Sequence, residues 1–140
     1  MGYAIVTNEK EKAPVLSSIT KILFEIGISP SLKGYRLLRN AVYLYTIDEE
    51  RFCKPKELYE MLENMHNESV SSIESNMRHC VRQALNSGKL LELNRIMGID
   101  VINDNSPLSN LQFVTFVAEA VRYETNDNAP FLIDEFSVRI

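Results

Sequence analysis

The chain has 140 residues, of which 45% are hydrophobic and 24% charged, and its net charge at pH 7 is −4. This length and composition are those of one ordinary globular domain with a sizeable core. The negative total argues against strong nonspecific binding to nucleic acid, although a local basic face is compatible with it.

The sequence contains no apolar run of the ~20 residues that a bilayer-spanning helix needs. The charged residues Glu9, Lys10, Glu11 and Lys12 exclude a secretory signal segment there. We therefore expect a cytoplasmic protein that makes no membrane contact. Two cysteines are too few for a disulfide scaffold, and Cys80, within a helical pattern, is expected to be a small buried residue.

Helices dominate the predicted structure, which begins with a polar tail over residues 1–14. Apolar residues at helical spacing predict a helix over residues 17–27, ended by Gly27, and a longer one over residues 29–47 with Pro30 in its first turn. The charged residues 48–54 are expected to form a loop. A third helix is predicted from Pro55, with an apolar side that consists of Leu58, Met61, Leu62 and Met65.

A fourth helix is predicted over residues 71–85, where Ser71 and Glu74 form the S-x-x-E pattern of a capping box. Gly88 is expected to end this helix. A short fifth helix follows and ends at Gly98, and a sixth runs from about Ser109 to about residue 123. The buried stripe of the fourth helix is predicted to contain Ile73, Met77, Cys80 or Val81, and Leu85.

The last segment, NAPFLIDEFSVRI (residues 128–140), alternates between apolar and polar positions and predicts a strand. A lone strand is not stable. It would need YAIVT (residues 3–7) or a second copy of the chain as its partner. The two termini could therefore form a small β-ribbon, or the chain could form a homodimer.

The third and fourth predicted helices, joined by a short turn, fit a helix-turn-helix motif, whose second helix enters the major groove of DNA. The pattern alone is weak, because many helical proteins contain two such helices. The arginines and the histidine of the fourth helix are equally compatible with a solvated surface. The same two interpretations apply to a basic stripe on the second helix, formed by Lys33, Arg36 and Arg39.

The sequence carries no signature of an enzyme, a metal centre or a cofactor site. The five glycines are dispersed, and no nucleophile elbow or HExxH motif is present. The two histidines and two cysteines lack metal-ligand spacing. We therefore expect a protein that is not an enzyme and that binds neither a cofactor nor a metal.

Several motifs occur in the order and spacing of one known family. They are Glu25-Ile26-Gly27, Lys33-Gly34-Tyr35, Arg78-His79, Gly88, Gly98 and the F-V-x-x-V-A pattern from Phe113 to Ala118. With them the chain resembles the C-terminal DNA-binding (effector) domain of the sporulation response regulator, stage zero sporulation protein A. The resemblance covers about residues 15–124 and leaves residues 125–140 as a C-terminal extension.

This resemblance implies an all-α domain of six helices, with a helix-turn-helix formed by the third and fourth, that binds promoter DNA. It implies that Glu74, Arg78 and His79 keep residue types that the family uses to contact DNA. Together with the outward face of the predicted fourth helix, this makes the candidate DNA-binding residues Ser72, Glu74, Ser75, Asn76, Arg78, His79 and Arg82. The family has arginines where this chain has Ser72 and Ser75. It also has a receiver domain before this module, which we expect to be absent here.

Two functions remain open at this point. The first is a stand-alone DNA-binding transcription regulator with altered or relaxed sequence specificity. The second is a paralogue that no longer binds DNA and acts through a protein partner. The two serines and the negative charge favour the second, whereas Arg78 and His79 favour the first.

Overall fold

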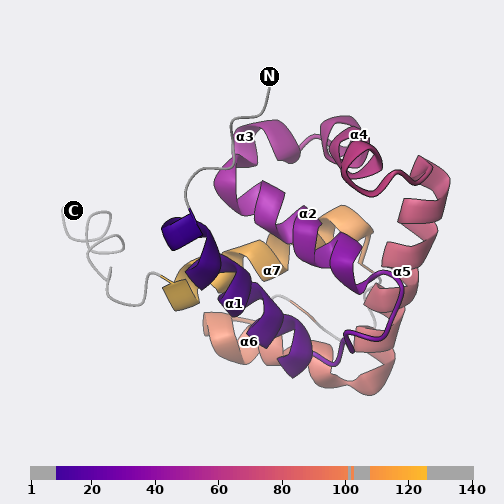
Figure 1. Ribbon diagram of the computed structural model, residues 1–140. Helices are drawn as coiled ribbons and strands as arrows, with labels where there is room; N and C mark the ends of the chain where they lie inside the picture. Colours follow the sequence, from indigo (N-terminus) through magenta and orange to yellow (C-terminus); the bar gives the residue numbers. More distant parts are fainter. Residues whose placement is uncertain (1–8, 101, 103–107, 126–140) are drawn as a thin grey trace.

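Three helices form the centre of the fold in the computed structural model, which describes residues 9–100, 102 and 108–125. Helices α1 (Glu9–Glu25) and α2 (Tyr35–Ile47) both pack against α7 (Asn110–Thr125), and α1 also contacts α2. The remaining elements surround this centre (Figure 1). They are α3 (Glu49–Phe52), α4 (Pro55–His66), α5 (Val70–Ser87), the 3-10 turn η1 (Lys89–Leu91) and α6 (Glu92–Met97).

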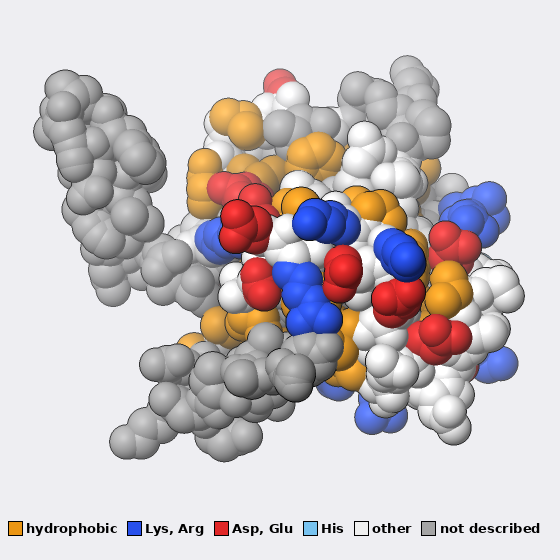
Figure 2. Space-filling view, turned by 90° about the horizontal axis from the view of Figure 1, so that it is seen from above, with side chains coloured by type: hydrophobic (Ala, Val, Ile, Leu, Met, Phe, Trp, Pro, Cys, Tyr) orange, Lys and Arg blue, Asp and Glu red, His pale blue; other side chains and the backbone are white. Residues whose placement is uncertain are grey.

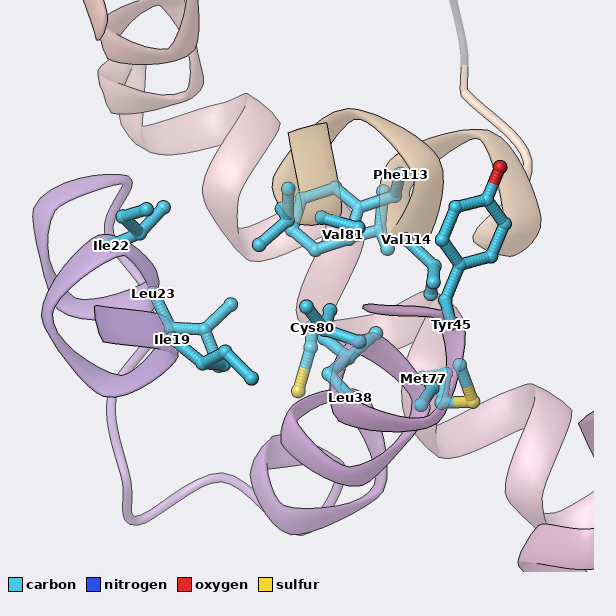
Figure 3. Packing of buried hydrophobic residues seen from close by; sticks show 14 of the residues in the cluster. Ile19, Ile22, Leu23, Leu38, Tyr45, Met77, Cys80, Val81, Phe113 and Val114 are labelled. Carbon is cyan, nitrogen blue, oxygen red and sulfur yellow. The ribbon is translucent and has the colours of Figure 1, made fainter. Parts of the chain in front are cut away.

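Side chains from α1, α2, α5 and α7 meet in one hydrophobic core (Figure 3). Ile19 and Leu23 of α1 and Phe113 of α7 are completely buried there. Each helix contributes a stripe at a spacing of three to four residues, as the 3.6-residue period requires. Because α5 buries only one stripe in this core and lies at the edge of the molecule, its opposite side is free to contact another molecule (Figure 1).

The all-α class is confirmed, since the described residues form seven α-helices and no strand. The third predicted helix corresponds to α4, the fifth to η1 and α6, and the sixth to α7. One residue on α4 differs from the prediction, because Met65 is 47% exposed rather than part of the apolar side. The two predicted terminal strands, and with them the β-ribbon, lie outside the described residues.

The first helix begins eight residues before its predicted start, because α1 includes residues 9–16 and contains Pro14. The sequence EKEKA before this proline consists of strong helix formers. The prediction of a tail that extends as far as residue 14 was therefore wrong for residues 9–14. Pro14 does not mark the end of a tail but lies within the long helix α1.

The second helix begins later than predicted, at Tyr35 instead of residue 29. The residues before it form turns, in which the Ser29 hydroxyl accepts a hydrogen bond from the backbone N–H of Ser31 at 3.1 Å. Such local side-chain bonds compete with helix formation. Pro30 therefore lies in a turn and not in the first helical turn. The predicted loop over residues 48–54 contains the one-turn helix α3, whose first turn is capped by the Asp48 carboxylate.

Candidate nucleic-acid interface

Helices α4 and α5 form a helix-turn-helix whose turn contains only Asn67, Glu68 and Ser69. Asn67 adopts the left-handed conformation (φ 53°, ψ 47°), which asparagine tolerates better than most residues. Its backbone N–H still bonds to the Glu63 carbonyl at 2.8 Å, which closes α4. The left-handed residue redirects the chain immediately, so that α5 starts three residues later.

The N-cap of α5 is Ser69, whose hydroxyl oxygen accepts a hydrogen bond from the backbone N–H of Ser72 at 3.2 Å. The predicted capping box of Ser71 and Glu74 was therefore wrong, and the helix starts at Val70. The predicted end was correct, because Gly88 follows the helix in the left-handed conformation. Both ends of α5 are thus fixed by local features of the chain, a serine cap at its start and a left-handed glycine at its end.

The inner face of α5 is anchored in the core. Burial raises the pKa of the Cys80 thiol to about 11, so this side chain is neutral and serves as a small hydrophobic residue, as predicted. Gly34, just before α2, lies against this part of α5, where a Cβ on it would be 2.9 Å from the Cys80 sulfur. The buried stripe consists of Ile73, Met77, Cys80, Val81 and Ala84, whereas the predicted Leu85 is only half-buried.

The outer face of α5 carries four of the seven residues predicted to contact DNA. Ser75, Arg78, His79 and Arg82 are exposed. They lie at offsets of three, four and seven residues, which the 3.6-residue period brings to one side of the helix. Among the described residues, neither arginine forms an ion pair, so both cations face solvent without a neutralising partner.

Ser72 and Asn76 lie on one flank of α5 and are half-buried. The Ser72 hydroxyl donates to a Glu68 carboxylate oxygen at 3.0 Å and accepts from the Asn76 amide at 3.5 Å. These bonds tie both side chains into the first turns of the helix. Ser72 and Asn76 therefore lie at the edge of the outward set, three residues along the helix from Ser75 and His79, and are less exposed than its members.

Glu74 lies on the opposite flank of α5, beside a residue that the sequence analysis missed. Asn110 is 8% exposed, and its amide donates to the Tyr59 hydroxyl at 3.2 Å and to the Glu74 backbone carbonyl at 3.1 Å. Among the described residues it is the one buried polar side chain of the molecule. It links the start of α7 to both helices of the motif.

The asparagine at position 110 gave only a weak signal in the sequence, because asparagine at a helix start is usually a cap. The capping role belongs instead to Ser109, which exchanges hydrogen bonds with Gln112 at 3.0 and 3.1 Å. The partner of Asn110, Tyr59, is half-buried, and this burial raises the pKa of its phenol. Asn110 is thus free to reach across to the other helices.

The predicted basic stripe lies only partly on the second helix, because Arg36 and Arg39 belong to α2 whereas Lys33 precedes its first residue, Tyr35. Lys33 and Arg36 are exposed and Arg39 is half-buried. The His66 imidazole, at the end of α4, shares a hydrogen bond of 3.0 Å with the Asn40 amide of α2. Burial lowers the pKa of His66; the charge of Glu68 opposes this shift, and the charges of Arg36 and Arg39 add to it.

Acidic and basic side chains alternate over the face formed by α3 and α4 (Figure 2). This view therefore shows no large area of one sign. Two ion pairs involve α3: Arg51 bonds Glu57 of α4 at 3.2 Å, and Glu49 bonds Arg122 of α7 at 2.9 Å. Arg78 and Arg82 of α5 form no ion pair among the described residues and so remain available to a polyanion.

Two further properties of the described residues bear on the class of the protein. They contain no group of three or more His, Cys, Asp or Glu residues that could hold a metal ion. None of the helices in the described part of the chain is long and apolar enough to cross a bilayer.

A short helix-turn-helix supported by further helices, with arginines exposed on its second helix, is the arrangement of the helix-turn-helix class of DNA-binding domains. A family model described as the sporulation initiation factor Spo0A C terminal matches residues 19–121. The chain therefore belongs to this family of DNA-binding effector domains, and the resemblance found in the sequence is confirmed. Residues 125–140 lie beyond the match.

Proposed function

We propose that this chain is a transcription regulator that binds duplex DNA through α5, with altered or relaxed sequence specificity. The observation that carries the proposal is the exposed set of Ser75, Arg78, His79 and Arg82 on a helix that is anchored on its other side. Arginine and histidine side chains there can contact phosphates or guanine edges. Lys33 and Arg36, which are both exposed, would add contacts to the DNA backbone.

Relaxed specificity follows from the residues that face the bases. The family resemblance implies arginine at positions 72 and 75, and bidentate arginine contacts contribute ~1–3 kcal/mol each to base discrimination. Ser75 is exposed but short, and the Ser72 hydroxyl is already bonded to Glu68. Glu74 and Asn76, which we also propose to lie near the bases, are half-buried. Phosphate contacts therefore contribute a larger share of the affinity than base contacts.

A salt series tests this function. The full chain would be titrated against labelled duplexes that carry either the family's promoter box or a scrambled sequence, with fluorescence anisotropy as the readout. We expect affinity to fall steeply with salt, with a modest preference between the two duplexes. Arg82→Ala should weaken both complexes and reduce the salt slope by about 1. Arg95→Ala, an exposed arginine on α6, is the matched control and should change neither.

A second function has its own support in the negative net charge of −4 and in the two serines of α5. In this alternative the chain has lost DNA binding and acts through contacts with a protein, either a partner regulator or a second copy of itself. The absence of any complex with either duplex at low salt would overturn the first function in favour of this one. Equal effects of Arg82→Ala and Arg95→Ala would also count against α5 as the DNA-binding surface.

A further inference from the structure

A groove runs along the flank of α5, between that helix, the start of α4 and the start of α7. Its volume is about 540 Å³. Its lining is mostly apolar and includes Tyr59, Val81, Leu85, Leu108 and Leu111. The buried contact of Asn110 with Tyr59 and the Glu74 carbonyl forms part of its wall, so the groove is supported on three helices.

The charges at this groove restrict what can occupy it. Arg78 and Arg82 both line it and form no ion pair among the described residues, whereas Glu74 is its one acidic residue. An occupant with apolar side chains and at least two negative charges would bury the apolar lining and neutralise both arginines. A nucleic acid could neutralise the arginines, but its backbone would leave the leucines uncovered.

One segment of this chain has that chemistry and lies outside the family match. Residues 131–140, FLIDEFSVRI, combine the adjacent acids Asp134 and Glu135 with six apolar residues. The chain leaves α7 at Thr125, at the other end of the helix from Asn110, and 16 helical residues span about 24 Å. Asp134 is nine residues beyond Thr125, and an extended chain of that length spans about 30 Å, so the acidic pair and the residues after it can reach the groove.

We propose that residues 134–140 dock in this groove of the same molecule, with Asp134 and Glu135 toward Arg78 and Arg82 and with Phe136, Val138 and Ile140 as the apolar side chains. The docked segment covers two cations of the outward face of α5. It therefore competes with DNA, a consequence that rests on the proposed function. The docking itself rests only on the groove, its charges and the reach of the segment.

Photo-crosslinking in the full chain tests the docking without any DNA. Phe136 would be replaced by p-benzoylphenylalanine, and the crosslinked peptides of the monomer would be mapped by mass spectrometry. We expect crosslinks to peptides that contain Leu85 or Leu111, and their loss in the Asp134→Lys/Glu135→Lys background. The same probe at Tyr123, exposed at the far end of α7, is the control and should not reach them. Crosslinks elsewhere, or only between two copies of the chain, would overturn the proposal.

DNA binding provides the second measurement. Asp134→Lys/Glu135→Lys should raise DNA affinity several-fold, because apparent affinity scales with the fraction of molecules whose site is open. Glu50→Lys/Asp100→Lys changes the net charge by the same amount at exposed positions outside the groove. It therefore controls for the general effect of added positive charge on DNA affinity. Equal gains in the two double variants would contradict competition. If no variant binds DNA, the proposed function fails, while the crosslinks still decide whether the segment docks.

Discussion

Gly34 lies so close to α5 that a Cβ on it would be 2.3 Å from the backbone oxygen of Asn76 and 2.7 Å from the carbonyl carbon. Its φ of −82° is one that any residue can adopt. Glycine is therefore required here for the close approach of two backbones and not for its conformational freedom. The contact sets the distance between the start of α2 and the middle of the recognition helix.

The first prediction follows from this contact. Gly34→Ala should lower the free energy of unfolding by about 3 kcal/mol, near the upper end for overpacking, because a backbone atom cannot rotate away. Gly88→Ala is the control, since it has a positive φ of 77° but no atom within 4 Å of the added Cβ. That variant should lose about 1 kcal/mol. Urea unfolding of both measures the difference, and equal losses would show that α2 moves aside at little cost.

The second prediction concerns the bridge that Asn110 makes between three helices. Asn110→Leu removes the hydrogen bonds to the Tyr59 hydroxyl and the Glu74 carbonyl and leaves both groups without that donor. We expect a loss of about 1–3 kcal/mol in unfolding free energy. Asn86→Ala, at an exposed position of α5, should stay within about 0.5 kcal/mol of the wild type. A loss of less than about 0.5 kcal/mol in Asn110→Leu would contradict a structural role for the hydrogen bonds of Asn110.

The sequence predicted the parts of the fold that depend on local periodicity and local backbone chemistry. The 3.6-residue pattern through Ile73 and Met77 identified the inner face of α5, and Gly88 identified its end. The family resemblance then indicated the helix-turn-helix correctly. Helical periodicity and the family resemblance also predicted the all-α class and the exposure of Arg78 and Arg82.

The sequence missed features that depend on tertiary contacts or on a choice between similar residues. The bridge of Asn110 joins residues 36 and 51 positions apart, which no local pattern reveals. The start of α5 was predicted at Ser71, whereas the cap is Ser69, a residue of the same type two positions earlier. Residue type alone does not distinguish these serines, and the structure places the cap directly after the left-handed turn at Asn67.

The third prediction uses this choice of cap. Ser69→Ala should destabilise the protein by about 1 kcal/mol, because the N–H of Ser72 loses the hydroxyl acceptor. Ser71→Ala, two residues away and exposed, should change stability by less than about 0.5 kcal/mol. Thermal and urea unfolding of the pair are the measurements. The reverse order of losses would favour the capping box that the sequence suggested over the cap in the structure.

The fourth prediction concerns pH. The folded state lowers the pKa of His66, chiefly through burial, so the unfolded chain binds the proton more tightly. Stability is therefore complete above the unfolded pKa of about 6.5 and decreases as the pH falls through the folded value. His66→Gln should reduce the stability lost between about pH 7.5 and about pH 5.5. His79→Gln, at the chain's other histidine, is exposed and is the control. An unchanged pH profile in His66→Gln would contradict the prediction.

The last prediction concerns the effect on DNA binding of an arginine added to the outward face of α5. Ser75 is exposed in line with Arg78 and His79, so Ser75→Arg adds a cation that points away from the core without disturbing it. We expect tighter DNA binding, a salt slope steeper by about 1, and up to ~1–3 kcal/mol of added base discrimination if the arginine reaches a guanine.

Ser72→Arg is the informative comparison, because it must first break the hydrogen bond of Ser72 with Glu68 at 3.0 Å. Its gain in affinity should therefore be smaller, and it should also lose some stability. Anisotropy titrations of both variants against the promoter-box and scrambled duplexes measure the affinities, and urea unfolding measures the stabilities. If Ser75→Arg leaves affinity and salt slope unchanged, the outward face of α5 does not lie on DNA. The same result would favour a protein partner as the ligand of this surface.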